Sequence, residues 1–185
     1  MPNHSEDHFA ELYSRYRSDV WLYCRRRLGS DRADDAMGDV FLTAWRRIEE
    51  APAAPDALRW LYRIAYLTVS NHWRSAGRKR RLKARVEAIG VTPPNPIADQ
   101  VVVRDEVRTV VDLLTKLKTS DAEILRLAAW EQLTTAQIAA VLDISPDAAK
   151  QRLSRARQRL VSLHDRTKPV DSSPPMLGKE VRGEH

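Results

Sequence analysis

Apolar residues recur every three or four positions along most of the chain, and this spacing predicts an all-α fold. Stretches rich in glycine or proline interrupt the spacing and set the ends of the predicted helices. The pattern predicts helices over about residues 8–28, 31–48, 57–75, 99–118, 120–131, 134–142 and 146–165.

Residues 86–98 contain Gly90 and three prolines, so this stretch cannot form a regular helix. We therefore predict two small helical domains joined by a proline-containing linker. The first is a three-helix domain over residues 1–85, and the second spans residues 99–165. Residues 166–185 combine proline, serine and glycine without periodicity, and we expect this tail to be disordered.

Local capping signals refine two of the helix starts. Gly29 is expected to end the first helix, and Ser30 or Asp31 is expected to cap the second. Ser120 and Glu123 have the three-residue spacing of a capping box, which predicts that their side chains close the start of the helix over 120–131.

The stretch from Leu133 to Leu160 predicts a helix-turn-helix. Thr134 and Gln137 have capping-box spacing, and Ser145-Pro146 is a favoured start for the second helix. That helix has an apolar back and a polar front sized for the DNA major groove, formed by Asp147, Lys150, Gln151, Ser154 and Arg155. The alternative interpretation is an ordinary amphipathic hairpin whose basic face is merely solvated.

The helix over 57–75 and the basic run after it carry arginines interleaved with aromatic residues. Single-stranded nucleic acid binds such faces, because cations follow the phosphates while rings stack on unpaired bases. The candidate residues are Arg59, Arg63, Tyr66, Asn71, Trp73, Arg74 and Arg78. The alternative is that the aromatic rings are edges of the hydrophobic core.

The distribution of charge supports contact with a polyanion at two places. The net charge of the chain is +6. Residues 51–85 carry a net charge of +8 and residues 146–185 a net charge of +4, whereas the rest of the chain is net acidic. Two basic blocks on an otherwise acidic chain favour two contacts with nucleic acid.

Several classes of function lack their usual signals in this sequence. Cys24 is the only cysteine, so no intrachain disulfide can form, and its apolar neighbours predict a small buried side chain. We find no phosphate-binding loop, no metal-spaced Cys/His cluster and no nucleophile elbow, so neither catalysis nor a cofactor is expected. No apolar run approaches the ~20 residues of a membrane span, and the polar start does not read as a signal peptide. We expect a cytoplasmic protein.

Three segments, taken in order, resemble the extracytoplasmic-function (ECF) group of the sigma-70 family of bacterial RNA polymerase sigma factors. RADDAMGDVFLTAWRR (32–47) is similar to the acidic helix of sigma region two. ALRWLYRIAYLTVSNHWRSAGRKRR (57–81) is similar to the Trp-Leu-x-x-Ile-Ala helix with its trailing arginines, and residues 125–160 are similar to region four. The resemblance implies a non-enzymatic initiation factor that binds core polymerase and promoter DNA, commonly restrained by an anti-sigma factor.

The resemblance also implies roles for individual residues. The second helix would dock on the clamp helices of the largest polymerase subunit through Asp34, Asp35, Asp39 and the neighbourhood of Phe41. Residues 49–56 would hold a flipped base of the upstream-ten promoter element. The melted strand would follow Arg63, Asn71, Trp73 and Arg74, and the helix from Pro146 would read the upstream-thirty-five element.

The chain departs from the family pattern at four positions. Asp143 stands where the helix-turn-helix usually has its turn glycine, although aspartate still tolerates a left-handed backbone. Ala36 and Gly38 stand where the family usually has leucine and glutamine, and Leu67 stands where it often has asparagine. A glycine inside a helix costs up to ~1 kcal/mol and removes a contact, which puts the polymerase-docking residues in question.

A second class of function remains open at this stage. A stand-alone repressor or activator would bind duplex DNA through its helix-turn-helix, usually as a dimer on paired half-sites, with a sensing or dimerising N-terminal domain. The arginine-aromatic helix argues against this alternative, because a sensor domain has no need of it. A helical enzyme acting on nucleic acid is the third and most remote option.

Overall fold

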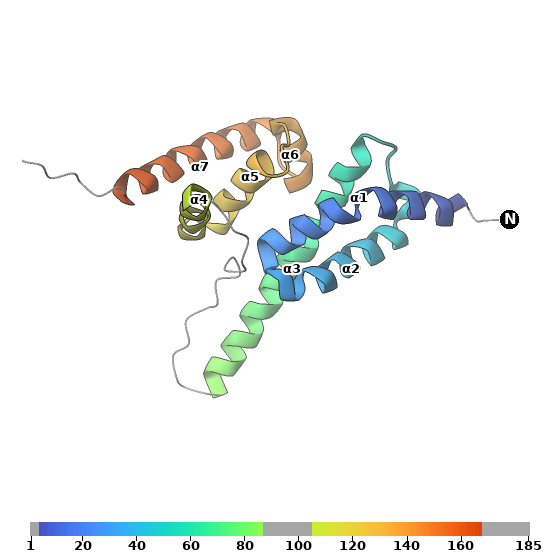
Figure 1. Cartoon of the computed structure of the whole chain (residues 1–185), viewed down its shortest axis with the longest axis horizontal. Helices are drawn as coiled ribbons and strands as arrows, with labels where there is room; N and C mark the ends of the chain where they lie inside the picture. The colour runs from blue at the N-terminus through green and yellow to red at the C-terminus, as the bar shows by residue number, and fades with distance from the viewer. Residues whose placement is uncertain (1–3, 87–104, 168–185) are drawn as a thin grey trace, which may run out of the picture.

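The structure, a computed structural model, describes residues 4–86 and 105–167, and these residues are helical apart from short connections (Figure 1). The first helical unit consists of α1 (His4–Leu28), α2 (Ser30–Arg46), the short 3-10 helix η1 (Ile48–Glu50) and α3 (Asp56–Val86). The second helical unit consists of α4 (Asp105–Lys116), α5 (Thr119–Ala129), α6 (Thr135–Leu142) and α7 (Pro146–Thr167). The all-α prediction is confirmed for the described residues.

Two of the predicted boundary segments lie mostly outside the described residues. The predicted linker 86–98 is described only at Val86, which still belongs to α3. The predicted tail 166–185 is described only at Arg166 and Thr167. Both of these residues continue α7, so the expectation of disorder was wrong for them.

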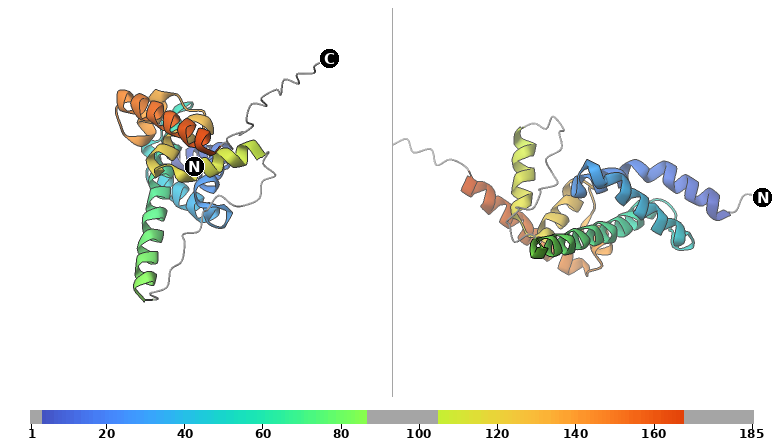
Figure 2. Two further views of the ribbon diagram at one scale, coloured as in Figure 1. Left: turned by 90° about the vertical axis from the view of Figure 1, so that its left-hand side faces the viewer. Right: turned by 90° about the horizontal axis from the view of Figure 1, so that it is seen from below.

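In the first unit, α1 and α2 form a tight antiparallel pair that lies on α3 (Figures 1 and 2). Gly29 reverses the chain between them with a φ of 81°, a backbone conformation that glycine adopts without steric cost. Gly29 itself is the N-cap of α2, and no side chain caps that helix, so the predicted cap by Ser30 or Asp31 was wrong. The chain enters the helix immediately after the glycine turn.

Helix α3 is longer than its sequence pattern predicts. It continues past Ser75 to Val86, and Figure 1 shows its C-terminal half projecting beyond the other helices of the first unit. The basic run that begins at Arg78 lies within this projecting part. Arginine and lysine are good helix formers, and they need no apolar face to continue a helix that is already nucleated.

In the second unit, α5 and α6 both pack against α7. Helix α5 begins at Thr119, and its N-cap Lys118 makes no side-chain capping bond, so the predicted capping box of Ser120 and Glu123 was wrong. The Glu123 side chain is instead buried and bonded to residues of α1. A carboxylate in an apolar interior is held by the cation it meets there rather than by the nearest backbone N–H.

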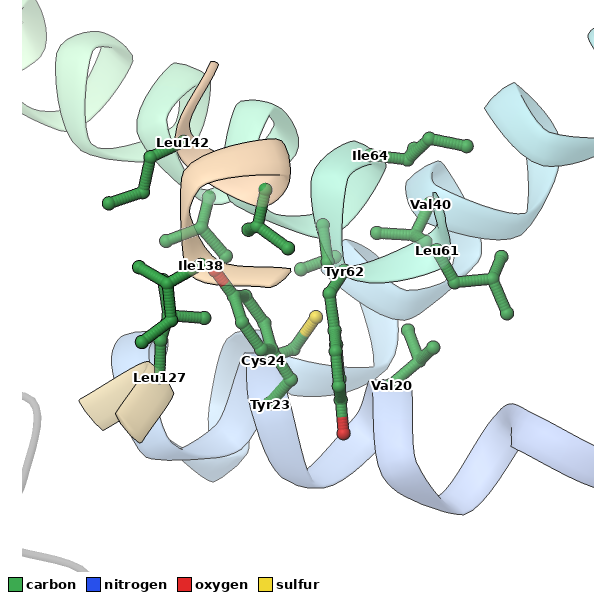
Figure 3. Packing of buried hydrophobic residues seen from close by; sticks show 14 of the residues in the cluster. Val20, Tyr23, Cys24, Val40, Leu61, Tyr62, Ile64, Leu127, Ile138 and Leu142 are labelled. Atoms are coloured by element: carbon green, nitrogen blue, oxygen red, sulfur yellow. The ribbon is translucent and has the colours of Figure 1, made fainter. Parts of the chain in front are cut away.

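The two units share one continuous hydrophobic core. Helix α6 lies against α3, and Figure 3 shows Ile138 and Leu127 of the second unit beside Tyr23 and Tyr62 of the first. The Tyr23 and Tyr62 rings stack with their centroids 5.3 Å apart. Cys24 lies in the same core and is fully buried, as predicted. The sequence pattern indicated two domains but gave no sign that they pack together.

Candidate nucleic-acid interface

Helices α6 and α7 form a helix-turn-helix with the local geometry that the sequence predicts. The Thr134 side chain accepts a hydrogen bond from the Gln137 N–H (3.3 Å), and the Gln137 side chain accepts one from the Thr134 N–H (2.9 Å), which completes the predicted capping box. Asp143 makes the turn with a φ of 58°. The Ser145 hydroxyl then accepts a hydrogen bond from the Ala148 N–H (3.1 Å), which caps α7.

The polar front of α7 faces solvent. Ala149, Leu153 and Ala156 are buried against the rest of the second unit. The opposite side of the helix is exposed at every residue predicted to contact DNA, namely Asp147, Lys150, Gln151, Ser154 and Arg155. The helix therefore presents a polar surface that carries two cations and one carboxylate, while its apolar side is buried.

On the face of α3 that is predicted to bind single-stranded DNA, some side chains form a local ion pair or hydrogen bond. Arg59 lies 3.1 Å from the Asp56 carboxylate, and Arg74 donates a 2.7 Å hydrogen bond to the Asn71 side chain. Asn71, Arg74 and Arg78 are exposed. These contacts join residues one helical turn apart, and such surface pairs are weak enough for a phosphate to replace.

The aromatic residues of this face are less exposed than the arginines. Tyr66 and Trp73 are half-buried, and both pack against the hydrophobic core. Each ring is therefore partly an edge of the core, as the alternative interpretation holds. Only its outer part remains for a stacked base.

Arg63 does not lie free on this face. Its guanidinium donates one hydrogen bond to the Val141 carbonyl (3.0 Å) and another to the Asp143 carboxylate (2.9 Å). Both acceptors belong to the end of α6 and the turn before α7. In this structure Arg63 therefore joins the two units, and its predicted contact with a melted strand, which would have to replace these two bonds, stays a prediction.

The acidic face of α2 is exposed but includes two side-chain contacts. Asp34 accepts a 2.9 Å hydrogen bond from the Trp21 indole, Asp39 lies 2.9 Å from the His72 ring, and Asp35 is exposed. These carboxylates remain on the surface and can meet a basic partner.

Phe41 is not part of that exposed face. Its side chain is only 4% exposed, and the centroids of the Phe41 and Tyr13 rings lie 4.7 Å apart in the core. The prediction that the Phe41 side chain itself docks on the polymerase was therefore wrong. Its neighbours are the exposed groups: Leu42 is 48% and Trp45 is 39% exposed. Position 41 lies in the apolar stripe of α2, and packing against α1 accounts for its burial.

A buried charged cluster links the two units, and the sequence reasoning missed it. The cluster comprises Tyr23 and Arg27 of α1, Glu123 of α5 and Glu131, which follows α5; it is called the Arg27 cluster below. The Arg27 Nε lies 2.9 Å from Glu123 and its Nη1 lies 3.1 Å from Glu131, while the Tyr23 hydroxyl donates a 2.8 Å hydrogen bond to Glu123. The side chains of Arg27, Glu123 and Glu131 are 0%, 3% and 1% exposed.

Burial and neighbouring charges shift the pKa values of two members of this cluster, Arg27 and Tyr23. Burial alone would lower the pKa of Arg27, but Glu123, Tyr23 and Glu131 together raise it well above its ordinary value, so Arg27 stays charged. Burial raises the pKa of the Tyr23 hydroxyl, which therefore remains a hydrogen-bond donor. One sequence signal was present, because Arg27 follows Val20 and Tyr23 at core spacing on α1.

Two further classes of site find no support in the part of the chain that the structure covers. Among residues 4–86 and 105–167, no group of three or more His, Cys, Asp or Glu side chains is arranged to hold a metal ion. None of the helices described there combines the length and the apolar character that a membrane crossing needs.

Comparison with known proteins identifies the family. The model of Sigma-70 region 2 matches residues 12–79, and that of Sigma-70, region 4, matches residues 108–160. The chain is 31% identical to the ECF RNA polymerase sigma factor SigK of Mycobacterium sp. (strain KMS) over 150 residues, which cover 80% of this chain and 78% of the relative. The chain belongs to the ECF group of the sigma-70 family.

Another curated relative of this sigma factor is CnrH of Cupriavidus metallidurans, which is 31% identical over 71% of the chain and 73% of the relative. Among solved structures, CnrH in complex with the cytosolic domain of CnrY has a TM-score of 0.61 at 23% identity, covering 86% of this chain and 89% of that one. RpoE of Bartonella quintana, in complex with the anti-sigma factor NepR, has a TM-score of 0.59 at 19% identity, covering 86% and 98%. These two structures show the fold. The family is one of non-enzymatic transcription factors.

Proposed function

We propose that this sigma factor binds core RNA polymerase and directs it to promoters, where it takes part in recognition and melting of the DNA. It acts in the cytoplasm and contributes no catalytic group. The observation that carries the proposal is the presence of two different nucleic-acid faces on one chain: the exposed front of α7, and the arginine-rich face of α3. One surface suited to duplex DNA and another suited to single-stranded DNA fit a protein that both locates and opens a promoter.

Helix α7 is proposed to read the upstream-thirty-five element as duplex DNA. The N-terminal half of α7 packs on the other helix of the helix-turn-helix, so its exposed polar side can enter the major groove. Arg155 and Lys150 can pair with guanine edges, and Gln151 can pair with adenine. Ser154 and Asp147 complete this exposed surface.

Helix α3 is proposed to follow the nontemplate strand after melting. Arg59, Arg74 and Arg78 would neutralise phosphates, and Asn71 lies among them on the same helix. The outer parts of Tyr66 and Trp73 would stack on unpaired bases. The segment over residues 49–56, which runs from the last two residues of η1 to the first residue of α3, would hold a flipped base.

Helix α2 is proposed to dock on the clamp helices of the largest polymerase subunit. Asp34, Asp35 and Asp39 supply the negative charge that a basic helix requires. Leu42 and Trp45, two large apolar side chains exposed on the same helix, would give the contact an apolar centre. An anti-sigma factor is proposed as a further partner, and the related fold of RpoE is seen bound to one.

A stand-alone repressor would explain the exposed surfaces of α3 and α7 less well. Such a protein would read paired half-sites as a dimer, and its first unit would sense or dimerise. The exposed arginines of α3 have no purpose there, and the family to which the chain belongs acts with polymerase.

A reconstituted transcription assay tests the proposed function. Core polymerase, this protein and fragmented bacterial genomic DNA are mixed, and the 5′ ends of the transcripts are sequenced. We expect new start sites that share two upstream sequence elements and are missing with core polymerase alone. The matched control is the double variant Lys150→Glu, Arg155→Glu, which should still bind polymerase but lose these starts. Start sites identical to those of core polymerase alone would contradict the proposal.

A further inference from the structure

The exposed face of α2 is bounded by two carboxylates, each held by a different neighbouring helix. At about 100° per residue, Asp34 and Asp39 lie about 140° apart around the helix axis. Asp35 and Leu42 lie between them and are exposed, whereas Val40 on the opposite side of the helix is buried. The two carboxylates therefore mark the two edges of the surface that is proposed to dock on the polymerase.

Asp34 is held by a tryptophan of α1. The indole N–H of Trp21 donates a 2.9 Å hydrogen bond to the Oδ1 atom of Asp34. Trp21 is half-buried and packs against the hydrophobic core, and the Arg25 guanidinium lies 5.2 Å from the centroid of its ring. This packing and the cation–π contact restrain the donor. An indole N–H carries no net charge, so the bond orients the carboxylate without neutralising it.

Asp39 is held by a histidine of α3, on the other side of α2. The Nε2 atom of His72 lies 2.9 Å from the Oδ2 atom of Asp39. Because an ionised carboxylate can only accept hydrogen bonds, this ring nitrogen carries a proton and donates. The His72 side chain is 24% exposed and the Asp39 side chain is 58% exposed. The ring thus orients Asp39 from below while the carboxylate stays open to solvent.

These bonds leave both carboxylates able to bind a partner. Each bond uses one carboxylate oxygen, and a carboxylate offers about four acceptor positions on its two oxygens. Asp34 and Asp39 can therefore accept a hydrogen bond from a cation without releasing Trp21 or His72. A side chain that is already ordered in the free protein loses less conformational freedom when it enters an interface, so its contact contributes more to affinity.

The stability of the fold is a poor explanation for these bonds. In the Arg27 cluster the Glu123 side chain is 3% exposed and its charge is compensated by an arginine, so that carboxylate serves the interior. Asp34 and Asp39 are exposed, and polar contacts of exposed carboxylates contribute little to stability. What these bonds change is the orientation of charge on the surface.

We propose that Trp21 and His72 are positioning residues for polymerase docking, and that each orients one carboxylate of α2 toward a cation of the polymerase. The inference rests on the proposed function, because the partner is the polymerase surface that α2 is proposed to bind. Neither Trp21 nor His72 has to touch the polymerase, since each acts through the carboxylate that it holds. The docking surface of this sigma factor thus depends on side chains of three helices, α1, α2 and α3.

Double-mutant cycles, measured as affinity of the full chain for core polymerase, test the inference. Trp21→Phe and His72→Phe each remove the hydrogen-bond donor and keep an aromatic ring. Each should lower the affinity about twofold to tenfold, because the freed carboxylate must then be ordered on binding. Trp21→Phe should cause no further loss in an Asp34→Ala background, nor His72→Phe in an Asp39→Ala background. His72→Gln restores a side-chain N–H donor and should recover most of the affinity.

Two matched controls separate positioning from a general effect on the fold. Asp35 is exposed on the same face, and no hydrogen bond or ion pair joins it to another described side chain. The loss caused by Trp21→Phe should therefore persist in full in an Asp35→Ala background. Trp130→Phe makes the same change at a half-buried tryptophan of the second unit and should leave the affinity unchanged. Thermal unfolding checks that each variant folds, and Trp21→Met, which also lacks the donor, replaces Trp21→Phe if that variant does not.

Each cycle decides the role of its own residue. Equal losses from Trp21→Phe in the wild-type, Asp34→Ala and Asp35→Ala backgrounds would show a merely structural effect and overturn its positioning role, and so would an unchanged affinity of the single variant. The same comparison with Asp39→Ala decides His72. In these cases the wild-type chain still binds polymerase and the proposed function stands. If the wild-type chain does not bind polymerase in this assay, the proposed function is wrong and the positioning role is wrong with it.

Discussion

At the scale of single residues, burial determines which side chains are available for binding. Arg155 and Arg27 are both arginines on helices, but Arg155 is exposed and Arg27 is enclosed by two carboxylates. An exposed guanidinium can bind a base edge or a phosphate. A buried guanidinium can bind only the groups that are buried beside it. The same distinction separates Phe41, which is core, from the exposed Trp45.

Arg155→Ala should weaken promoter recognition by ~1–3 kcal/mol, because Arg155 lies on the front of α7 and can pair with a base edge or a phosphate. The transcription assay above measures the loss. Thermal unfolding should be unchanged, since the side chain is exposed. Arg166→Ala, an equal loss of charge in the last turn of the same helix, is the control and should leave promoter use intact. Unchanged promoter use by Arg155→Ala would remove this residue from the reading surface.

The thiol of Cys24 should react very slowly in the native protein. Burial raises its pKa from the ordinary range to about 12, so at pH 8 it is almost entirely the unreactive protonated form. With an aromatic disulfide reagent at pH 8, we expect the native reaction to be at least about a thousandfold slower than that of the chain in guanidinium chloride. Equal rates in the two conditions would mean that the core around α1 is open in solution.

At the scale of elements, short-range signals account for the helix-turn-helix. Thr134, Gln137 and Ser145 act on backbone groups within three residues of themselves, and each makes the bond that its spacing predicts. Asp143 supplies the left-handed turn between the helices. Glu123 has the same local spacing as Gln137 but fails to cap, because a buried arginine from another helix competes for its carboxylate. Capping predictions from short sequence spacing therefore hold where no residue distant in the sequence binds the capping side chain more strongly.

Gly38→Ala should stabilise α2 by about 0.5–1 kcal/mol, because alanine loses less conformational entropy in a helix than glycine does. A Cβ added at Gly38 meets no atom within 4 Å, so the substitution introduces no clash. Urea unfolding followed by circular dichroism measures the change.

Gly29→Ala is the matched control for Gly38→Ala, and its expected effect on stability has the opposite sign. The φ of Gly29 is 81°, and alanine there should destabilise the turn between α1 and α2 by about 1 kcal/mol or more. A destabilising Gly38→Ala would show that the exposed surface of α2 is not free in solution.

At the scale of the whole molecule, the sequence predicts the parts better than their assembly. Helix positions, the buried stripes and the exposed front of α7 follow from spacing within single helices. The joining of the two units depends on pairs such as Tyr23 with Glu123 and Arg63 with Asp143, which lie 100 and 80 residues apart. Neither member of such a pair signals its partner in the sequence, because a charge run at the end of α1 is equally consistent with a solvated helix terminus.

Binding to core polymerase is the most direct test of the central claim, that this sigma factor acts through the polymerase. The purified protein is mixed with bacterial core RNA polymerase and separated by gel filtration, and its affinity for promoter duplex is measured alone. The account predicts co-elution as a stoichiometric complex and weak duplex binding by the free protein, whose two faces are held together. Failure to co-elute, together with tight binding of duplex DNA by the protein alone as a dimer, would contradict it.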